Sequence, residues 1–481
     1  MLNIEPKRVF DYFESIASIP HGSRNTKQIS DYVVDVAENL GLIYYQDDSN
    51  NVIVYKAGQN GGEDRKSVII QGHLDMVCEK EEDCDIDFEK DGLSLVLNDG
   101  LLSAEGTTLG GDDGIAVAYM LAILEDSEMT HPPLECVFTV DEEIGMLGAA
   151  ALDKSRLMGK RLLNVDSEEE GHLLVSCAGG ATVTLTIPVK RRGAQGSRYK
   201  ISVTGLLGGH SGVEIDKGRA NADIVLGSLL KELMYADDSL KLIGINGGLK
   251  DNAIPVKAEA VIISQKQDTI AGMLPELNAK VKDLYGENDP DITFSISEAD
   301  ENDEYSELYP MDESESMNLI MLLGSAPFGV RKMSEDIEGL VQTSLNLGIL
   351  ITTEDRVVIS YSVRSSVEKE LEELIDELDT LARSVGGTVL VEGKYPAWEY
   401  RENSSLRDVM TNTYFEMFGK DMVVEAIHAG LECGIFAGAI KDFDAVSFGP
   451  DIYDIHTPKE RLSVESVSRM WDYMKTVLER L

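Results

Sequence analysis

Cysteine is scarce in this sequence. The 481 residues hold five cysteines, an odd number at wide spacing and without a CxxC pair: Cys78, Cys84, Cys136, Cys177 and Cys433. This set disfavours a disulfide framework and a thiolate zinc site, so we expect reduced thiols. Any metal ion in this protein must therefore be held by histidine and carboxylate side chains.

Long hydrophobic runs are also absent. No stretch approaches the ~20 apolar residues that span a bilayer. Residues 1–20 mix charges into an amphipathic pattern, unlike the basic-then-apolar order of a secretory signal. We therefore expect a cytoplasmic protein that does not enter a membrane.

Basic residues are few relative to acidic ones. Lys and Arg number 43 against 86 Asp and Glu, which gives a formal net charge of −43. Such a charge repels phosphate backbones, so nucleic acid is a poor candidate partner. Much of the acidity is expected on solvated surface, including the segment 298–315, which we interpret as an exposed loop.

The chain is longer than one ordinary core allows, so two folding units are expected. The first ~180 residues alternate helical and strand-like segments, which predicts an α/β fold with a mostly parallel mixed sheet flanked by helices. From Lys190 onward the pattern becomes α+β, and the alternation of strand-like and helical segments resumes near Trp398. We therefore assign residues 1–184 and 396–481 to a catalytic domain and residues 185–395 to an inserted α+β domain.

Periodicity locates the individual elements. Apolar runs at 67–71, 134–140 and 161–165 predict buried strands, and 42–45 with 52–55 predict a hairpin. Helices are expected over residues 9–19, 29–40, 114–124, 221–234, 270–285, 368–385, 408–418 and 464–481.

Polar residues follow several of the apolar runs or open a helix. They are, in chain order, His73, Asp75, Asp112, Glu142, Glu143, Asp166 and His456. Each short motif by itself is more often a surface turn or a helix cap. Because functional groups gather at the carboxyl ends of the strands in open α/β sheets, however, we expect these side chains to meet at one edge.

The residue types indicate a pair of metal ions. Zinc sites without thiolates use histidine nitrogen and carboxylate oxygen and leave room for water. Asp112, flanked by glycines at a helix N-terminus, suits a carboxylate that bridges two ions. His73 and Asp166 are then expected on one ion, and Glu143 and His456 on the other. Two Zn²⁺ ions per subunit are expected, with Mn²⁺ or Co²⁺ as alternatives.

Two further carboxylates support this site. Asp75 lies two residues beyond His73, where it can accept the second imidazole N–H and fix the ring's orientation. Glu142 precedes the ligand Glu143, and adjacent residues at a strand end point in different directions, so Glu142 can face a bound water. Metal binding lowers the pKa of water from 15.7 toward about 7, and Glu142 can then act as general base in amide hydrolysis.

Several segments resemble the co-catalytic dizinc metallopeptidases, the family that includes glutamate carboxypeptidases, tripeptide aminopeptidases and, most similar of all, aminoacyl-histidine dipeptidases. The segments span nearly the whole chain: QGHLDMV, EGTTLGGDDGIAVA, TVDEEIGMLGA, LLNVDSEEEG, GGHSGVEIDKGRANA, IHAGLECGIF and DIHTPKERL. The resemblance implies the same metal ligands, Glu142 as base, Asp75 as orienting residue, a lid role for the inserted domain and a homodimer. Asp rather than Glu at position 166 implies a dipeptidase or aminopeptidase instead of a carboxypeptidase.

One departure from the family pattern concerns the bridge. Many relatives have an Asp-Asn pair where this chain has Asp112 and Asp113. Which of the two carboxylates bridges is therefore open, although the flanking glycines favour Asp112.

Four more residues are assigned through the resemblance. His210 in GGHSG resembles a lid histidine that holds the scissile carbonyl oxygen, in its own site or across a dimer. Asn252 and Arg364 resemble lid groups that bind the substrate's backbone and carboxylate. Glu432 resembles a partner for the substrate's ammonium group, with a buried structural carboxylate as the alternative. Without the resemblance, His210 is typical of a turn and Arg364 of a surface ion pair.

The sequence thus predicts a metallo-dipeptidase that hydrolyses unblocked dipeptides, Xaa-His and related, with small peptides as its partners. A tripeptide aminopeptidase or an N-acyl amino acid deacylase on the same scaffold is the alternative within the class. A non-catalytic metal- or peptide-binding protein is the alternative from another class, although such a protein has no need of a base at position 142.

Overall fold

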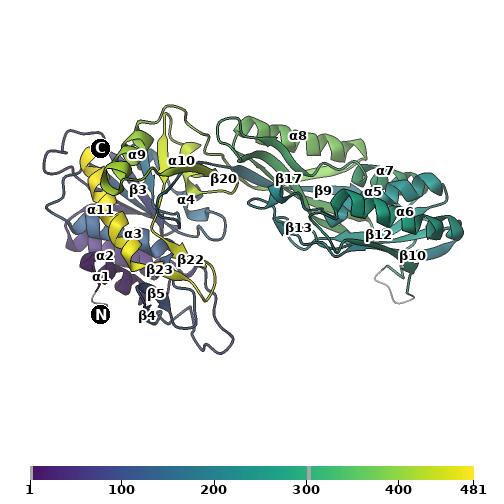
Figure 1. Ribbon diagram of the computed structural model, residues 1–481, viewed down its shortest axis with the longest axis horizontal. Coiled ribbons are helices and arrows are strands. Elements are labelled where there is room, and N and C mark those ends of the chain that lie inside the picture. The colour runs from purple at the N-terminus through teal and green to yellow at the C-terminus, as the bar shows by residue number, and fades with distance from the viewer. Residues whose placement is uncertain (1–3, 301–304) are drawn as a thin grey trace. The chain divides into compact units, whose positions relative to one another are not determined.

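A computed structural model describes residues 4–300 and 305–481, and Figure 1 labels many of its helices and strands. The chain divides into two compact units. Unit 1 consists of Met1–Cys177, Trp398–Ala426 and Leu431–Leu481, and unit 2 of Ala178–Ala397 and Ile427–Gly430. Within the described residues, no helix is both long enough and apolar enough to cross a membrane.

The main sheet of unit 1 has the strand order β1-β2-β6-β3-β7-β21-β8-β20. The neighbours β6, β3, β7 and β21 run parallel to one another, whereas β1 and β2 form an antiparallel hairpin at one edge. The predicted α/β sheet and its hairpin are thereby confirmed. The strands are β1 (Ile43–Gln46), β2 (Val52–Lys56), β3 (Val68–His73), β6 (Leu134–Thr139), β7 (Arg161–Asn164), β8 (His172–Cys177), β20 (Val423–Ile427) and β21 (Asp444–Ser447).

Burial explains why the sequences of these strands are continuously apolar. Every residue of β3 and of β6 is buried, as expected for parallel strands covered on both faces. The helices of unit 1 are α1 (Lys7–Ala17), α2 (Lys27–Asn39), α3 (Gly111–Glu125), α4 (Leu147–Ala151), α9 (Ser405–Phe418), α10 (Glu432–Ala437) and α11 (Val464–Arg480). Helix α3 is buried throughout from Gly114 to Leu124, so it is a central helix of the unit.

A small second sheet in unit 1 has the order β22-β23-β5-β4. Its strands are β4 (Leu95–Asn98), β5 (Leu101–Ala104), β22 (Ile452–Tyr453) and β23 (Arg461–Ser463). The short connection from β22 to β23 carries His456. The pairing of β23 with β5 therefore ties this C-terminal segment to the N-terminal half of the chain.

Unit 2 is built on an antiparallel sheet with the order β15-β10-β14-β12-β17-β18-β9-β19, and β16 pairs with β17. Inward and outward residues alternate along β9 and β10, as in a sheet with one buried face. The strands are β9 (Gly179–Pro188), β10 (Ser197–Thr204), β12 (Lys241–Gly247), β14 (Ala258–Ser264), β15 (Thr293–Glu298), β16 (Gly329–Met333), β17 (Val341–Thr352), β18 (Arg356–Ser365) and β19 (Thr388–Tyr395).

Helices cover the buried face of that sheet and share one apolar core with it. They are α5 (Ala222–Ala236), α6 (Gln267–Tyr285), α7 (Glu313–Leu323) and α8 (Glu368–Ser384). A separate two-stranded ribbon pairs β11 (Gly209–His210) with β13 (Ala253–Ile254).

The prediction of an exposed loop over residues 298–315 was wrong for part of that segment. Residues 301–304 lie outside the described residues. After them, Tyr305 and Met311 are buried and Glu313 opens helix α7. The acidic composition masks these apolar side chains, which pack inward while the charges remain at the surface.

Candidate metal centre

The carboxyl ends of three adjacent strands bring the predicted ligands together in unit 1. Strand β3 ends on His73, β7 ends two residues before Asp166, and β6 ends three residues before Glu142. Asp112 stands in the first turn of α3, and His456 follows β22. Since β6, β3 and β7 are parallel neighbours, their ends lie at the same edge.

The carboxylate of Asp112 lies between two imidazoles. Its Oδ1 is 3.1 Å from Nε2 of His73, and its Oδ2 is 3.1 Å from Nε2 of His456. The two oxygens of one side chain therefore face two different histidines, which is the arrangement of a bridging ligand.

One more carboxylate stands beside each histidine. Oδ1 of Asp166 is 3.6 Å from Nε2 of His73, and Oε1 of Glu143 is 3.1 Å from Nε2 of His456. Two of the groups in unit 1 that could hold a metal ion are His73 with Asp113 and Asp166, and Asp112 with Glu143 and His456. Neighbouring ligand atoms of a tetrahedral zinc ion lie roughly 3.4 Å apart, given bonds of about 2.1 Å. The observed separations fit two such ions.

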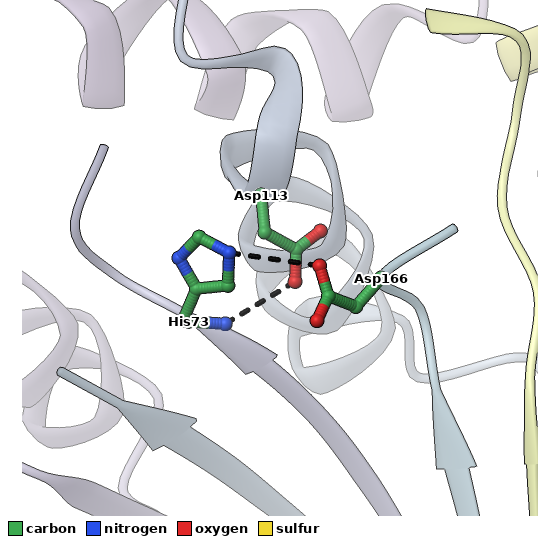
Figure 2. A group of neighbouring side chains, drawn as sticks. All are labelled: His73, Asp113 and Asp166. Carbon is green, nitrogen blue, oxygen red and sulfur yellow. Dashed lines mark hydrogen bonds and ion pairs between the residues drawn. The ribbon is translucent and has the colours of Figure 1, made fainter. Parts of the chain in front are cut away.

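Asp113 belongs to the same cluster but meets different atoms. Figure 2 shows its carboxylate beside His73 and Asp166, with Oδ2 accepting the backbone N–H of His73 at 3.2 Å. Asp113 is 1% exposed, and burial raises the pKa of its carboxyl well above the usual range. The neighbouring Asp112 also reaches His456, so it is Asp112 that links the two groups.

Asp75 ties the first histidine to the turn after β6. Its carboxylate accepts the backbone N–H groups of Glu142 at 3.0 Å and of Glu143 at 3.4 Å, and the hydroxyl of Ser23 at 2.8 Å. Nδ1 of His73 lies 2.9 Å from the backbone oxygen of Asp75 and 3.6 Å from the carboxylate. Backbone and side chain of Asp75 together therefore orient the imidazole.

The concentration of acids shapes the electrostatics of the cluster. Burial and neighbouring carboxylates raise the pKa of Glu142 well above its usual value, and they raise the pKa of Glu168 to about 8. Hydrogen bonds to Asp112 and Glu143 raise the pKa of His456 to about 10. Carboxylates outnumber the two histidines in this site, and bound cations would balance the excess of negative charge, so the donor set suits metal ions in charge as well as in geometry.

Three residues assigned to substrate lie in unit 2. His210 pairs with Ala253 across the ribbon, and the N–H of Ser211 donates to the carbonyl of Asn252 at 2.9 Å, so His210 and Asn252 share this ribbon. Arg364 stands on β18, where its Nη1 donates to the hydroxyl of Tyr395 at 3.1 Å. Burial and then the charge of Arg364 lower the pKa of His210. A histidine that stays neutral can accept as well as donate a hydrogen bond.

Glu432 belongs to unit 1 and is closed off from solvent. Its Oε2 accepts the hydroxyl of Thr139 at 2.6 Å and the side-chain amide of Gln71. Within the described chain, Oε1 has no hydrogen-bond partner. Burial raises the pKa of this carboxyl to about 8.

Two buried polar residues with strong local contacts were missed by the sequence analysis. Glu460 is 2% exposed and accepts backbone N–H groups from the turn that carries Asp112. His428 is 5% exposed in unit 2, with Nε2 at 2.7 Å from the hydroxyl of Ser344, and burial followed by Arg364 lowers its pKa to about 3. Both stand in motifs that carry the family resemblance. His428 directly follows β20, a strand that the sequence analysis did not predict, and Glu460 precedes β23 rather than following a strand.

Comparison with known proteins gives full-length matches. Residues 69–480 match the model of peptidase family M20/M25/M40. The cytosol non-specific dipeptidase of Escherichia coli is 34% identical over 99% of this chain and 98% of its own length. The crystal structure of the aminoacylhistidine dipeptidase of Vibrio alginolyticus superposes with a TM-score of 0.92 at 33% identity, covering 100% of this chain and 97% of that one. An aminopeptidase from Bacillus cereus, 16% identical with a TM-score of 0.58 over 99% and 98% of the two chains, shares the fold.

Proposed function

We propose that this chain, which belongs to peptidase family M20/M25/M40, hydrolyses unblocked dipeptides with two bound metal ions and a glutamate base. The observation that carries the proposal is the carboxylate of Asp112, whose two oxygens each lie 3.1 Å from a different histidine. The full-length relatives are named as dipeptidases, one non-specific and one acting on aminoacyl-histidine peptides. We therefore propose Xaa-His dipeptides among a wider set of dipeptide substrates.

We assign the metal ligands according to these distances. His73 and Asp166 would hold one ion, Glu143 and His456 the other, and Asp112 both. Zn²⁺ is proposed because the donors are two imidazoles and carboxylates without thiolate, and Mn²⁺ and Co²⁺ accept the same donors. When bound, such ions polarise the peptide carbonyl and lower the pKa of a water molecule toward about 7.

The protein's own groups then move the proton. Glu142 takes a proton from the attacking water and passes it to the leaving amine, which requires its carboxyl to be ionised at the start. Burial and nearby acids hold that pKa high in the metal-free protein, and positive charge in the site would lower it. Asp75 keeps the Glu142 turn and the His73 ring in place through its hydrogen bonds.

For substrate binding we propose His210, Asn252 and Arg364 of unit 2 and Glu432 of unit 1. The His210 donor would stabilise charge on the carbonyl oxygen, Asn252 would bind the peptide backbone, and the Arg364 guanidinium would pair with the free carboxylate. Glu432 has one oxygen without a hydrogen-bond partner among the described residues, which suits an ammonium group. Its complete burial suits a structural role equally, so the two roles stand as alternatives.

Assembly and location are also proposed from the relatives. We propose a cytoplasmic enzyme, since the Escherichia coli relative is named as a cytosol protein. We also propose a homodimer, because the family resemblance places a lid histidine across such an interface in some members. His210 would then act in its own site or in that of the partner.

The test is a substrate panel on the metal-loaded protein. We expect turnover of unblocked dipeptides, Xaa-His included, and loss of turnover when a chelator removes the metal. A preference for tripeptides would indicate a tripeptide aminopeptidase, and turnover of N-acyl amino acids a deacylase. If the protein binds peptides but hydrolyses no compound of the panel, the result would contradict the proposed activity and indicate a non-catalytic binding protein.

A further inference from the structure

A single buried carboxylate binds the turn that presents Asp112. Oε2 of Glu460 accepts the backbone N–H groups of Leu109 at 2.8 Å and Gly110 at 3.1 Å. Oε1 accepts those of Gly111 at 2.8 Å and Asp112 at 3.3 Å. Glu460 is 2% exposed, so these bonds are shielded from water.

These N–H groups have no other cap. The N-terminal groups of a helix lack intrahelical partners, and a local side chain normally satisfies some of them. At the start of α3 the cap position is Gly110, which has no side chain to offer and a φ of +65°. The backbone of Asp112 and Asp113 is non-helical, so residues 109–112 form a turn ahead of the regular part of α3, and Glu460 supplies the missing acceptor for this turn from about 350 residues further along the chain.

The same short segment also carries His456. The N–H of Glu460 donates to the carbonyl of Thr457 at 3.1 Å, and the Thr457 hydroxyl donates to the carbonyl of Asp454 at 2.7 Å. Residues 454–460 therefore form a turn closed by its own hydrogen bonds. One end of this turn places His456 beside Asp112, and the other holds the backbone of Asp112 through Glu460.

We propose that Glu460 is a positioning residue that sets the bridging carboxylate of Asp112 between His73 and His456. The inference rests on the proposed two-metal function. Both carboxylate oxygens of Glu460 accept backbone N–H groups, so its role is to act through the backbone of the turn and not as a metal ligand. Replacing the carboxylate by an amide leaves one oxygen to accept and turns an NH₂ group toward N–H donors, so the turn cannot keep all its bonds.

Metal binding to the metal-free protein is the decisive measurement. Glu460→Gln is titrated with Zn²⁺ in competition with a chromophoric chelator, and its metal-free melting temperature and steady-state kinetics are recorded. Loss of a group that supports metal ligands typically weakens metal affinity by about 10–100-fold, and we expect a loss in that range. We also expect kcat to fall about tenfold or more with KM changed less than about twofold, because Glu460 sets the metal site and not the peptide contacts.

Glu135 provides a matched control. It is 1% exposed and accepts the backbone N–H groups of Met158 at 2.8 Å and Gly159 at 2.9 Å, at the end of β6 opposite to Glu142. Glu135→Gln should lower the melting temperature and leave Zn²⁺ affinity at the wild-type value. If Glu460→Gln binds Zn²⁺ as wild type does, or loses no more affinity than Glu135→Gln, the inference is overturned.

The outcomes also separate this inference from the function on which it rests. Wild-type protein that binds no metal would overturn the proposed function and the inference with it, whereas a metal-binding wild type with an unaffected Glu460→Gln overturns the inference alone. Should Glu460→Gln fail to fold, the decision moves to Glu460→Asp, whose carboxylate is set back by one methylene. Weakened Zn²⁺ binding in that variant supports the inference, and wild-type binding overturns it.

Discussion

Asp112 and Asp113 are adjacent in the chain, yet their carboxyl groups are in opposite electrostatic surroundings. Burial opposes ionisation of Asp112, but hydrogen bonds from His456 and His73 outweigh it and lower the pKa of its carboxyl. Asp113 is buried against Asp166 and Asp112, and its pKa is raised. The partners from distant segments therefore decide which of two identical side chains is a metal ligand in the proposal.

Asp223 is a buried acid of another kind, in the unit that holds none of the proposed metal ligands. It is 0% exposed in unit 2, and neither carboxylate oxygen has a hydrogen-bond partner among the described residues. Burial raises its pKa well above the usual range. The folded protein therefore holds this proton to a higher pH than the unfolded chain does, and the contribution of Asp223 to the stability of the folded state declines as pH rises above about 3.9, the ordinary pKa.

Asp223→Asn removes this titration while keeping the size of the side chain. We expect the stability of Asp223→Asn relative to wild type to increase by up to about 1.4 kcal/mol per pH unit between pH 5 and the folded pKa of Asp223. The measurement is urea unfolding of both proteins at pH 5, 6, 7 and 8, because other titrating groups cancel in the difference. A difference that is constant over this range would mean that Asp223 is ionised in the folded protein.

Some residues of the candidate site could be identified from the sequence alone, and others could not. His73 and Asp166 follow apolar runs, so a strand-end rule finds them in the sequence. The choice between Asp112 and Asp113 needs the positions of His73 and His456. Glu460 gives no such signal, because its partners are backbone N–H groups nearly 350 residues away.

Strand β3 and helix α3 approach each other closely at Gly72, next to His73. A Cβ at Gly72 would lie 2.5 Å from Oδ2 of Asp113 and 2.6 Å from Cβ of Ala116. Only a glycine leaves room for the helix at this distance. The packing of these two elements thus sets the separation between a histidine on one and the carboxylates on the other.

Gly72→Ala should push β3 and α3 apart. We expect a loss of about 1–3 kcal/mol in the free energy of unfolding, the usual cost of overpacking a core, together with weaker Zn²⁺ binding. Calorimetry and metal titration of the same protein provide both values.

Gly272 in α6 is the control for this substitution. It is exposed, and a Cβ there would meet nothing within 4 Å. Gly272→Ala should stabilise the protein by about 0.5–1 kcal/mol through helix propensity and leave Zn²⁺ binding unchanged. Equal behaviour of the two variants would contradict the role given to the β3–α3 contact.

Helices and strands whose apolar residues form a continuous run or a regular amphipathic spacing could be predicted from the sequence. The buried strands β3, β6 and β7 and the helices α1 and α11 lie within a few residues of their expected bounds, because apolar runs and amphipathic spacing mark them. Strand β4 was not predicted. Its side chains are largely exposed, so its sequence carries no burial pattern.

At the scale of the whole chain, unit 1 is assembled from both sides of unit 2. His73, Asp112, Glu143 and Asp166 precede unit 2, whereas His456 and Glu460 follow it. A complete ligand set therefore forms only when residues after Trp398 have joined the sheet built by the first 177 residues. The strand β21, parallel to β7, makes that connection within the sheet.

The central claim is that the five proposed ligands hold two metal ions beside Glu142, which serves as the base. Glu142→Gln tests it most directly, with metal content and dipeptide turnover measured on the same preparation. We predict two bound ions per chain, as in wild type, and a kcat lower by roughly 10²–10⁴-fold, the usual contribution of a positioned base. Undiminished turnover by Glu142→Gln with metal bound would contradict the account.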